Sequence, residues 1–306
     1  MSDQSPKLSV WMITYNHEKY VRQAIESVVK QVTDFSFELV IGDDCSTDET
    51  LEICLEYERQ YPQLIRVLQR QKNLGIHKNL ISTLDECRGE YIALLEGDDY
   101  WTERSKLQKQ VSFLSNHPEF VMCYQKTWEI NELTGSEKIT NEHDNATMGM
   151  SELLERGWFM RTGSLVFRNG LIKNFPEWYY HYPSTDYMLH ILLAQHGAIA
   201  FLNETTSVYR RHEGGITQVF QEKQVLFNQQ KHELLETINR YLNYQYEKEI
   251  RTHQKEMKYS SFMITLRHCR GLSDVLLLTK LLPYVNLWKI VSRSVSFVSR
   301  RLKMRV

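Results

Sequence analysis

The sequence lacks an excess of charge of one sign, paired cysteines and long hydrophobic runs. Its 306 residues carry 37 Lys and Arg against 38 Asp and Glu, which gives a formal net charge of -1. A nucleic-acid-binding protein would need a strongly basic surface, so we expect no nucleic-acid partner. With 25% charged and 42% hydrophobic residues, the composition excludes a polytopic membrane protein and a disordered chain. A soluble globular enzyme or binding module is expected.

The five cysteines are scattered and form no C-x-x-C pair. This spacing favours reduced thiols over a disulfide framework or a zinc site. The apolar run of residues 8–13 is too short for the core of a signal peptide. We therefore expect the N-terminal domain to remain in the cytoplasm.

Strand-length apolar runs alternate with amphipathic helical segments in the first half of the chain. The expected strands are residues 8–13, 37–42, 64–68 and 91–95, and the helices include 21–29, 77–87 and 107–114. This alternation predicts an α/β fold with a mostly parallel, Rossmann-like sheet flanked by helices. Beyond residue 218 the sequence is helical, so we expect a domain at 1–218 and a helical C-terminal region at 219–306. The polar segment 131–149 is expected to be an irregular loop over a site.

Ligands bind to such sheets at the carboxyl ends of the strands, so the residues that follow each strand are candidates. These segments are 14–16, 43–44, 73–75 and 96–99, and they are rich in Asp and Asn. None of them is a G-x-G-x-x-G or Walker loop. The classical dinucleotide and P-loop folds therefore lose most of their support.

Asp98 and Asp99 form an adjacent carboxylate pair directly after a strand. Two such groups repel one another, and Mg²⁺ or Mn²⁺ bound by one or two carboxylates and a substrate phosphate would relieve the repulsion. Gly97 would allow a nucleotide to approach the backbone closely. The alternative is a solvated turn in which Asp99 opens the next helix.

The segment from Asp43 to Thr50 follows the second strand. Ser46 is expected to cap the next helix, with Glu49 in a capping box near its N-terminus. This explanation leaves Asp43 and Asp44 without a role. A carboxylate at this position could accept a hydrogen bond from N3 of uracil.

Four segments occur in order within about 100 residues: Thr-Tyr-Asn at 14–16, Asp-Asp-x-Ser-x-Asp-x-Thr at 43–50, Asn-Leu-Gly at 73–75 and Glu-Gly-Asp-Asp at 96–99. Together they closely resemble the family 2 inverting glycosyltransferases, which have the nucleotide-diphospho-sugar transferase (GT-A) fold. The resemblance covers residues 7–217.

The resemblance implies roles for individual residues. The nucleotide-sugar would be bound by Thr14, Tyr15, Asn16, Asp44, Asn79 and Asp98. Within this set, Asp44 would contact uracil and Asp98 would face the ribose or the sugar. Asp99, together with Asp98 and His212, would hold Mn²⁺ or Mg²⁺.

Asp186 opens an amphipathic helix, and the resemblance makes it the catalytic base that deprotonates the acceptor hydroxyl. The alternative is an ordinary first-turn acid behind a Ser184 cap. His212 lies in a Tyr-Arg-Arg-His segment that resembles a late motif of the family, in which Arg210 or Arg211 would neutralise phosphate. The alternative for these three residues is a solvated basic turn.

The tail at 275–306 has seven basic residues and no acidic one, interleaved with apolar side chains. Charges interrupt every window of transmembrane length. The pattern favours a basic amphipathic helix at an anionic membrane interface, and a helix packed on protein is the alternative.

Together these features predict a cytoplasmic, metal-dependent inverting glycosyltransferase, peripheral at the inner face of the plasma membrane. It would transfer a hexose or N-acetylhexosamine from a UDP-sugar to a glycan or lipid-linked acceptor in cell-surface polysaccharide synthesis. The alternatives are a nucleotidyltransferase and a catalytically inactive glycan- or nucleotide-binding module.

Overall fold

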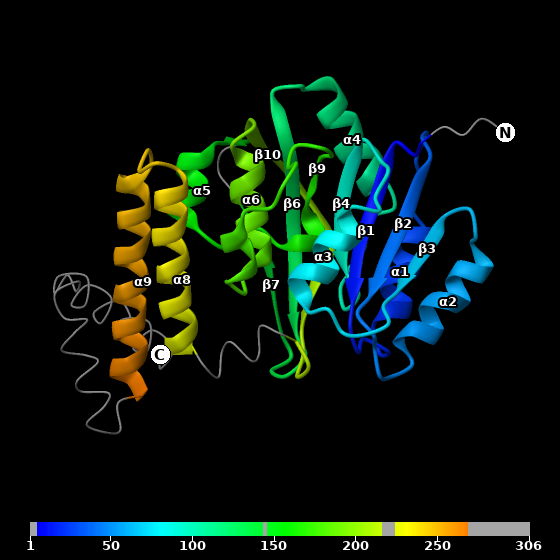
Figure 1. Cartoon of the computed structure of the whole chain (residues 1–306), viewed down its shortest axis with the longest axis horizontal. Helices are drawn as coiled ribbons and strands as arrows, with labels where there is room; N and C mark the ends of the chain where they lie inside the picture. The colour runs from blue at the N-terminus through cyan, green and yellow to red at the C-terminus, as the bar shows by residue number, and fades with distance from the viewer. Residues whose placement is uncertain (1–4, 143–145, 216–223, 269–306) are drawn as a thin grey trace, which may run out of the picture. The chain divides into compact units, whose positions relative to one another are not determined.

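The computed structural model describes residues 5–142, 146–215 and 224–268. The chain divides into two compact units, Met1–Gln221 and Glu222–Val306, and each is described by itself (Figure 1). The four described cysteines form no disulfide.

A ten-stranded sheet with the order β3-β2-β1-β4-β9-β6-β10-β5 forms the centre of the first unit, and β7 and β8 pair with β6 and β10. The strands are β1 (Leu8–Thr14), β2 (Phe37–Asp43), β3 (Ile65–Gln69), β4 (Tyr91–Glu96), β5 (Tyr100–Trp101), β6 (Phe120–Asn131), β7 (Ser136–Thr140), β8 (Thr147–Met148), β9 (Val166–Arg168) and β10 (Ala198–Arg211). The predicted α/β fold with a sheet flanked by helices is confirmed.

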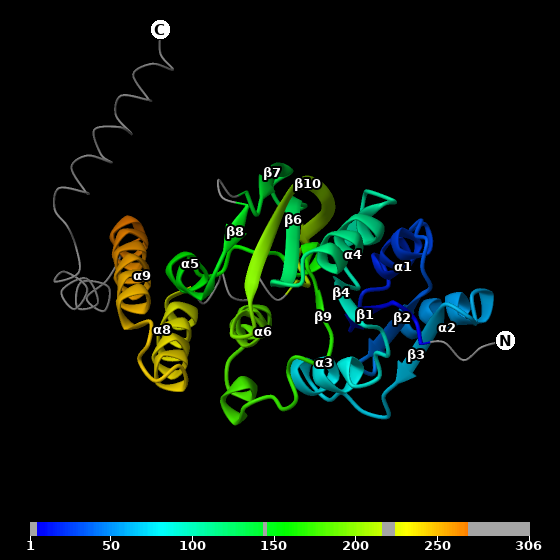
Figure 2. The same cartoon turned by 90° about the horizontal axis from the view of Figure 1, so that it is seen from above.

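Helices cover both faces of this sheet (Figure 2). They are α1 (Val21–Val29), α2 (Thr50–Gln60), α3 (Ile76–Leu84), α4 (Lys106–Asn116), α5 (Met150–Arg156), α6 (Thr185–Ala194) and the 3-10 helices η1 (Thr162–Ser164) and η2 (Glu177–Tyr180). Figure 2 shows α1 and α4 on one face and α3 and α6 on the other. The apolar face of α1 packs against β1 and β2 in the main core.

The direction of the strands brings their functional ends to one edge. Strands β3, β2, β1 and β4 are parallel to one another. Strand β9 is antiparallel to both β4 and β6, so β6 and its parallel neighbour β10 run in the direction of β4. The carboxyl ends of β1, β2, β4, β6 and β10 therefore face the same edge of the sheet.

Two local expectations are wrong. Residues 136–140 and 147–148 of the expected loop are strands, and β7 forms a hairpin with β6. The side chains of β7 are polar and largely exposed, so its strand conformation depends on pairing with β6. The second error concerns the expected Ser46 cap of α2, which starts at Thr50. The Thr50 backbone N–H donates to Asp48 Oδ1 at 3.0 Å, whereas the Ser46 hydroxyl donates to Asp43.

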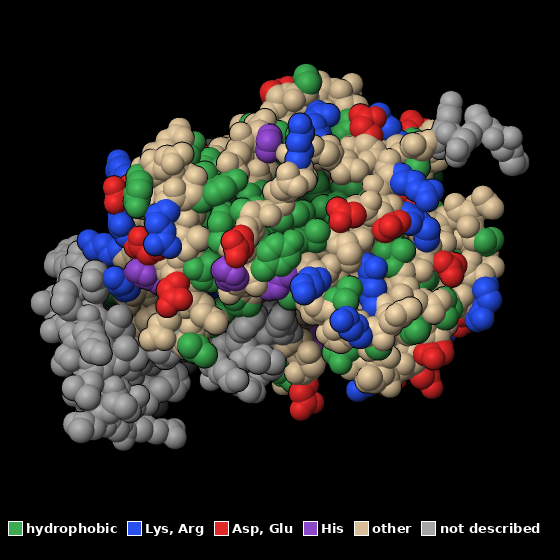
Figure 3. Space-filling view, viewed as in Figure 1, with side chains coloured by type: hydrophobic (Ala, Val, Ile, Leu, Met, Phe, Trp, Pro, Cys, Tyr) green, Lys and Arg blue, Asp and Glu red, His purple; other side chains and the backbone are tan. Residues whose placement is uncertain are grey.

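Charged side chains of both signs are interspersed over the β1–β3 end of the first unit, as the space-filling view shows (Figure 3). No basic patch covers the described residues on this face. Positive and negative charges are therefore mixed on this part of the surface, as the near-zero net charge of the chain suggests.

The second unit contains α8 (Gln224–Tyr241) and α9 (Glu247–His268), which pack against each other. Gln254 Nε2 of α9 donates to Glu236 Oε1 of α8 at 2.8 Å. Within the described residues, no helix is long and apolar enough to cross a membrane. The predicted basic tail, 275–306, lies outside the described residues.

Candidate active site

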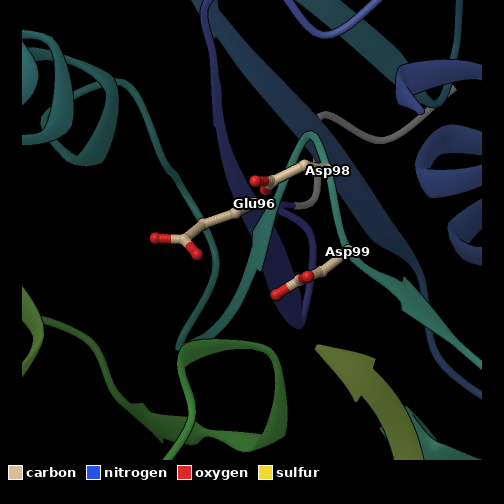
Figure 4. Close-up of side chains that lie close together, drawn as sticks. All are labelled: Glu96, Asp98 and Asp99. Atoms are coloured by element: carbon tan, nitrogen blue, oxygen red, sulfur yellow. The ribbon is translucent and has the colours of Figure 1, made fainter. Parts of the chain in front are cut away.

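Three carboxylates converge where β4 ends. Glu96 is the last residue of the strand, and Asp98 and Asp99 lie on the turn that follows (Figure 4). Each offers an oxygen, and these oxygens lie within 4.8 Å of one another. The turn is closed by the Asp99 N–H, which donates to the Glu96 carbonyl at 3.1 Å. A short turn after a buried strand thus gathers three acidic side chains.

Gly97 is required for this turn to approach β1. A Cβ at this position would lie 2.5 Å from Thr14 Oγ1 and 3.0 Å from His17 Nδ1. Contacts this short force neighbouring atoms to move. The glycine therefore sets the distance between the carboxylate turn and the loop after β1.

Burial and mutual repulsion disfavour the charged forms of Glu96 and Asp99. Burial and the charges of Asp98 and Asp186 raise the pKa of Glu96 to about 8, against the opposing effect of Arg161. Burial, Asp98 and Glu96 raise the pKa of Asp99 well above its usual value. A divalent cation would relieve this repulsion, and an all-oxygen ligand set suits Mg²⁺ or Mn²⁺. The residues present therefore fit such an ion.

Glu96 was not among the metal ligands predicted from the sequence. The signal was its position as the last strand residue, two places before Asp98. The fit of the acidic set to a cation is thus better than an Asp98–Asp99 pair alone would provide.

Two histidines flank Asp98. His212 Nε2 lies 3.0 Å from Asp98 Oδ2, and His17 Nε2 lies 3.8 Å from the same atom. Burial raises the pKa of Asp98, but His17 and His212 outweigh burial and lower it below its usual value. His212 thus contacts one of the clustered carboxylates and is not itself a member of the cluster. His17, missed in the sequence, directly follows the Thr14-Tyr-Asn segment.

Arg210 and Arg211 contact protein groups. The Arg210 N–H donates to Asp99 Oδ1 at 2.8 Å, and its guanidinium donates to the Asp98 carbonyl at 2.5 Å. The guanidinium also lies 4.4 Å from the centre of the Tyr100 ring. Arg211 pairs with Glu129 at 3.3 Å. Arg210 therefore fixes the Asp98–Asp99 turn to β10.

The loops after β1 and β2 are joined to one another. Asn16 has φ of 55°, and its Oδ1 accepts from the Thr47 N–H at 2.8 Å. Thr14 is buried and lies 3.2 Å from His17, whereas Tyr15 is 43% exposed. The predicted residues Thr14, Tyr15 and Asn16 thus border the same edge as the carboxylates.

Asp44 holds the Asn-Leu-Gly turn. Its Oδ1 accepts from the Leu74 N–H at 2.7 Å, and its Oδ2 accepts from the Gly75 N–H at 2.9 Å. Gly75 has φ of 80°, which is the left-handed conformation that glycine adopts readily. Each carboxylate oxygen retains a second lone pair for a ligand. The geometry connects two motifs that are about 30 residues apart in the chain.

Asn79 is buried and holds protein groups with both ends of its side chain. Its Nδ2 donates to the Gly42 carbonyl at 2.8 Å, and its Oδ1 accepts from Arg70 Nε at 3.2 Å. Ser82 also accepts from Arg70, at 2.8 Å. Asn79 therefore positions β2 and Arg70, a cation near the Asp44 loop that sequence reasoning did not identify.

Asp186 lies in the first turn of α6, where its Oδ1 accepts from the Tyr187 N–H at 2.7 Å. Its negative charge contributes to the raised pKa of Glu96. Ser184 precedes the helix, but its side chain makes no capping hydrogen bond. The segment before α6 contacts His77 of α3, whose Nε2 lies 2.7 Å from the Tyr182 carbonyl oxygen.

The curated relatives cover part of this chain. An uncharacterized protein of Mycobacterium tuberculosis is 40% identical over 213 residues, which are 68% of this chain and 60% of that protein. EpsE of Bacillus subtilis, which carries a glycosyltransferase name, is 37% identical over 118 residues, 39% of this chain and 42% of EpsE. The chain thus spans less than two thirds of the length of these relatives.

Solved structures share the fold. Staphylococcus aureus TarS 1-349 in complex with UDP-GlcNAc superimposes with a TM-score of 0.64 at 22% identity, over 90% of this chain and 79% of that one. A mannosyltransferase of Pyrobaculum calidifontis in complex with GDP-Man and Mn²⁺ gives a TM-score of 0.55 at 13% identity, over 91% of this chain and 80% of that one.

The family assignment comes from the sequence itself. The model of glycosyl transferase family 2 matches residues 9–175, which include β1 to β4, the carboxylate turn and β9. The resemblance to family 2 glycosyltransferases and the GT-A-like fold, both predicted from the sequence, are confirmed. The chain belongs to glycosyl transferase family 2.

Proposed function

We propose that this protein transfers a sugar from a nucleotide-diphospho-sugar, a UDP-sugar, to a hydroxyl group of a glycan or lipid-linked acceptor. The observation that carries the proposal is the convergence of Glu96, Asp98 and Asp99 within 4.8 Å at the carboxyl edge of the sheet. The charge of Asp186 acts on the same cluster. A cation and its diphosphate bound at this cluster would therefore lie within electrostatic range of a candidate base.

The donor would bind between the loops that Asp44 and Asn16 connect, with Thr14 and Tyr15 at its border. Asp44 would read uracil with its remaining lone pairs, and Asn79 would act through Arg70 and β2. Mn²⁺ or Mg²⁺ would be held by Asp99 and Asp98 together with Glu96. His212 would support this site through its contact with Asp98. When bound, the ion would supply positive charge to the departing diphosphate.

Asp186 would act as the general base. It would take the proton from the acceptor hydroxyl while that oxygen forms a bond to the anomeric carbon. The bond between this carbon and the diphosphate oxygen would break on the opposite side, so the configuration of the sugar would invert. A single carboxylate suffices, because the leaving diphosphate needs no proton from a general acid.

The names of related proteins support the class of product. TarS of S. aureus is named as a poly(ribitol-phosphate) β-N-acetylglucosaminyltransferase, and TuaG of B. subtilis carries a name in teichuronic acid biosynthesis. By similarity, we extend the proposal to a hexosyl- or N-acetylhexosaminyltransferase of cell-surface polysaccharide synthesis. The reaction would take place at the inner face of the plasma membrane, with the tail 275–306 as the contact.

The first test is calorimetric titration of the full chain with UDP, ADP and GDP, each with and without Mn²⁺. We expect metal-dependent binding that is selective for UDP. Selectivity for GDP would keep a transferase but remove the role of Asp44 in reading uracil. No binding of any of the three would overturn the proposed donor class and favour an inactive binding module.

A further inference from the structure

Glu129 on β6 gathers more positive charge than it neutralises. This glutamate is buried, with a side chain that is 3% exposed, and it pairs with Arg161, Arg211 and Lys138. The three cations lower its pKa below the usual value, although burial opposes them. Within the described residues, none of the three pairs with another carboxylate. The group therefore carries two positive charges that no described acidic side chain compensates.

Arg161 is held in place from several sides. Its backbone N–H donates to Asn141 Oδ1 at 3.1 Å, and Asn141 is buried with φ of 67°. Asn141 Nδ2 in turn donates to Ser164 Oγ at 3.0 Å. The guanidinium lies 4.4 Å from the centre of the Tyr209 ring. These contacts fix the backbone and the plane of the guanidinium before any ligand arrives.

The guanidinium of Arg161 is only partly used by the protein. Its Nη2 donates to Glu129, and its Nε is buried with no hydrogen-bond partner among the described residues. The side chain remains 31% exposed. An arginine kept only for an ion pair would be expected to satisfy its buried N–H, because an unmade hydrogen bond in the interior costs free energy.

Arg161 directly precedes η1, which packs against β4, β6 and β10. Its positive charge and the negative charge of Asp186 both act on Glu96. Asp98, in contrast, interacts with His17 and His212, and Asp99 interacts with Arg210. Strands β6 and β10, which carry Glu129 and Arg211, extend past β4 at this edge (Figure 1). Arg161 and Asp186 therefore both lie within electrostatic range of Glu96.

We propose that Arg161, supported by the net positive charge that Arg211 and Lys138 leave around Glu129, forms a subsite for an anionic group, phosphate or carboxylate, carried by the acceptor. This inference rests on the proposed function, because it names the class of acceptor for the same site. The planar fork of arginine matches the two oxygens of either anion and binds them with charge-assisted hydrogen bonds. The subsite would position an acidic glycan with its hydroxyl group toward Asp186.

The test uses the full chain with saturating UDP and Mn²⁺, titrated by calorimetry with glycerol 3-phosphate and, as the neutral control, with glycerol. We expect the wild type to bind only the phosphate ester. Arg161→Gln should weaken that binding about tenfold, the effect of losing a charge-assisted hydrogen bond. Arg161→Lys, which keeps the charge but not the fork, should restore part of the affinity. UDP affinity should be equal in all three proteins.

Lys138→Gln is the matched control, because it removes one charge from the same Glu129 group at an exposed position. We expect a smaller loss from this variant than from Arg161→Gln. An equal loss would reduce the effect to general electrostatic attraction and overturn the subsite. Thermal unfolding of each variant shows whether Glu129 remains satisfied by the two cations that are left.

Other results separate this proposal from the proposed function. The subsite is overturned if the wild type does not bind glycerol 3-phosphate, or if Arg161→Gln binds it equally well. Loss of UDP affinity in Arg161→Gln would assign the arginine to the donor diphosphate and also overturn it. Binding of glycerol 3-phosphate that depends on Arg161, in a protein that binds no UDP, would uphold the anion site and refute the proposed donor.

Discussion

At the scale of single residues, Glu96 behaves unlike an ordinary surface carboxylate. Its pKa is raised from 4.5 to about 8, first by burial and then by Asp98 and Asp186. Without a metal, the folded protein therefore keeps a proton on Glu96 at neutral pH, whereas the unfolded chain does not. A cation that binds there must displace this proton, so metal affinity should rise with pH up to about 8.

The linked effect on stability has the opposite sign. Because the folded state binds the proton more tightly, the contribution of Glu96 to stability is complete below pH 4.5 and is lost as the pH rises to about 8. We expect metal-free wild type to lose stability relative to Glu96→Gln across this window. Thermal unfolding of both proteins as a function of pH measures it, with saturating Mn²⁺ as the condition that removes the loss in the wild type. Parallel pH profiles for the two metal-free proteins would contradict the shift.

Asp186 should matter for the chemical step and not for donor binding. In Asp186→Asn, we expect transfer to fall by about 10²–10⁴-fold, the usual contribution of a general base. UDP affinity in the presence of Mn²⁺ should be unchanged, because the nucleotide loops do not include α6. Steady-state transfer assays and calorimetry provide the two readouts. Glu177→Gln, an exposed carboxylate on η2, is the control, and full activity of Asp186→Asn would exclude it as the base.

At the scale of elements, the turn between β4 and β5 depends on its close approach to β1. A methyl group at Gly97 would meet Thr14 Oγ1 at 2.5 Å, so Gly97→Ala must push the carboxylate turn or the β1 loop aside. We expect metal-dependent UDP affinity to fall by about tenfold and stability to fall by about 1–3 kcal/mol, the usual cost of overpacking.

Gly149→Ala is a matched control for this substitution, because its new methyl group would meet only Glu152 Oε2, at 3.5 Å. We expect this control to retain both UDP binding and stability. Calorimetry and chemical denaturation measure the two quantities. If Gly97→Ala binds UDP and Mn²⁺ as the wild type does, the turn tolerates a displaced Thr14 and the prediction is wrong.

Elements with local signals could be predicted from the sequence, whereas elements made by distant partners could not. Strand β1 and helix α1 have apolar periods of their own, so their positions follow from periodicity. Strand β7 is polar and exists because it pairs with β6. In the site, Asp98 and Asp99 were found because they form a carboxylate pair directly after a strand. His17 and Arg161 were missed because their relation to Asp98 and Glu96 arises only when distant segments meet.

At the scale of the whole molecule, the tail 275–306 is predicted from sequence alone to bind an anionic membrane interface. Deleting it should abolish sedimentation with liposomes that contain anionic lipid, because its basic residues and apolar side chains supply the attraction. The binding should weaken in high salt, since salt screens the attraction between basic residues and anionic lipid. The full chain with neutral liposomes is the control. A truncated protein that still co-sediments would exclude the tail as the membrane contact.

The residues proposed for donor and acceptor are separated along the chain. The residues proposed to bind the donor all belong to one uninterrupted stretch that ends at Trp101, while Arg161, Asp186 and the Glu129 group all come later. The later stretch can therefore vary while the earlier one stays unchanged, provided that Arg210 and His212, which contact the Asp98–Asp99 turn, are kept. We expect chimeras that join the first 101 residues of this protein to the later stretch of a relative to inherit the nucleotide preference of one parent and the acceptor of the other.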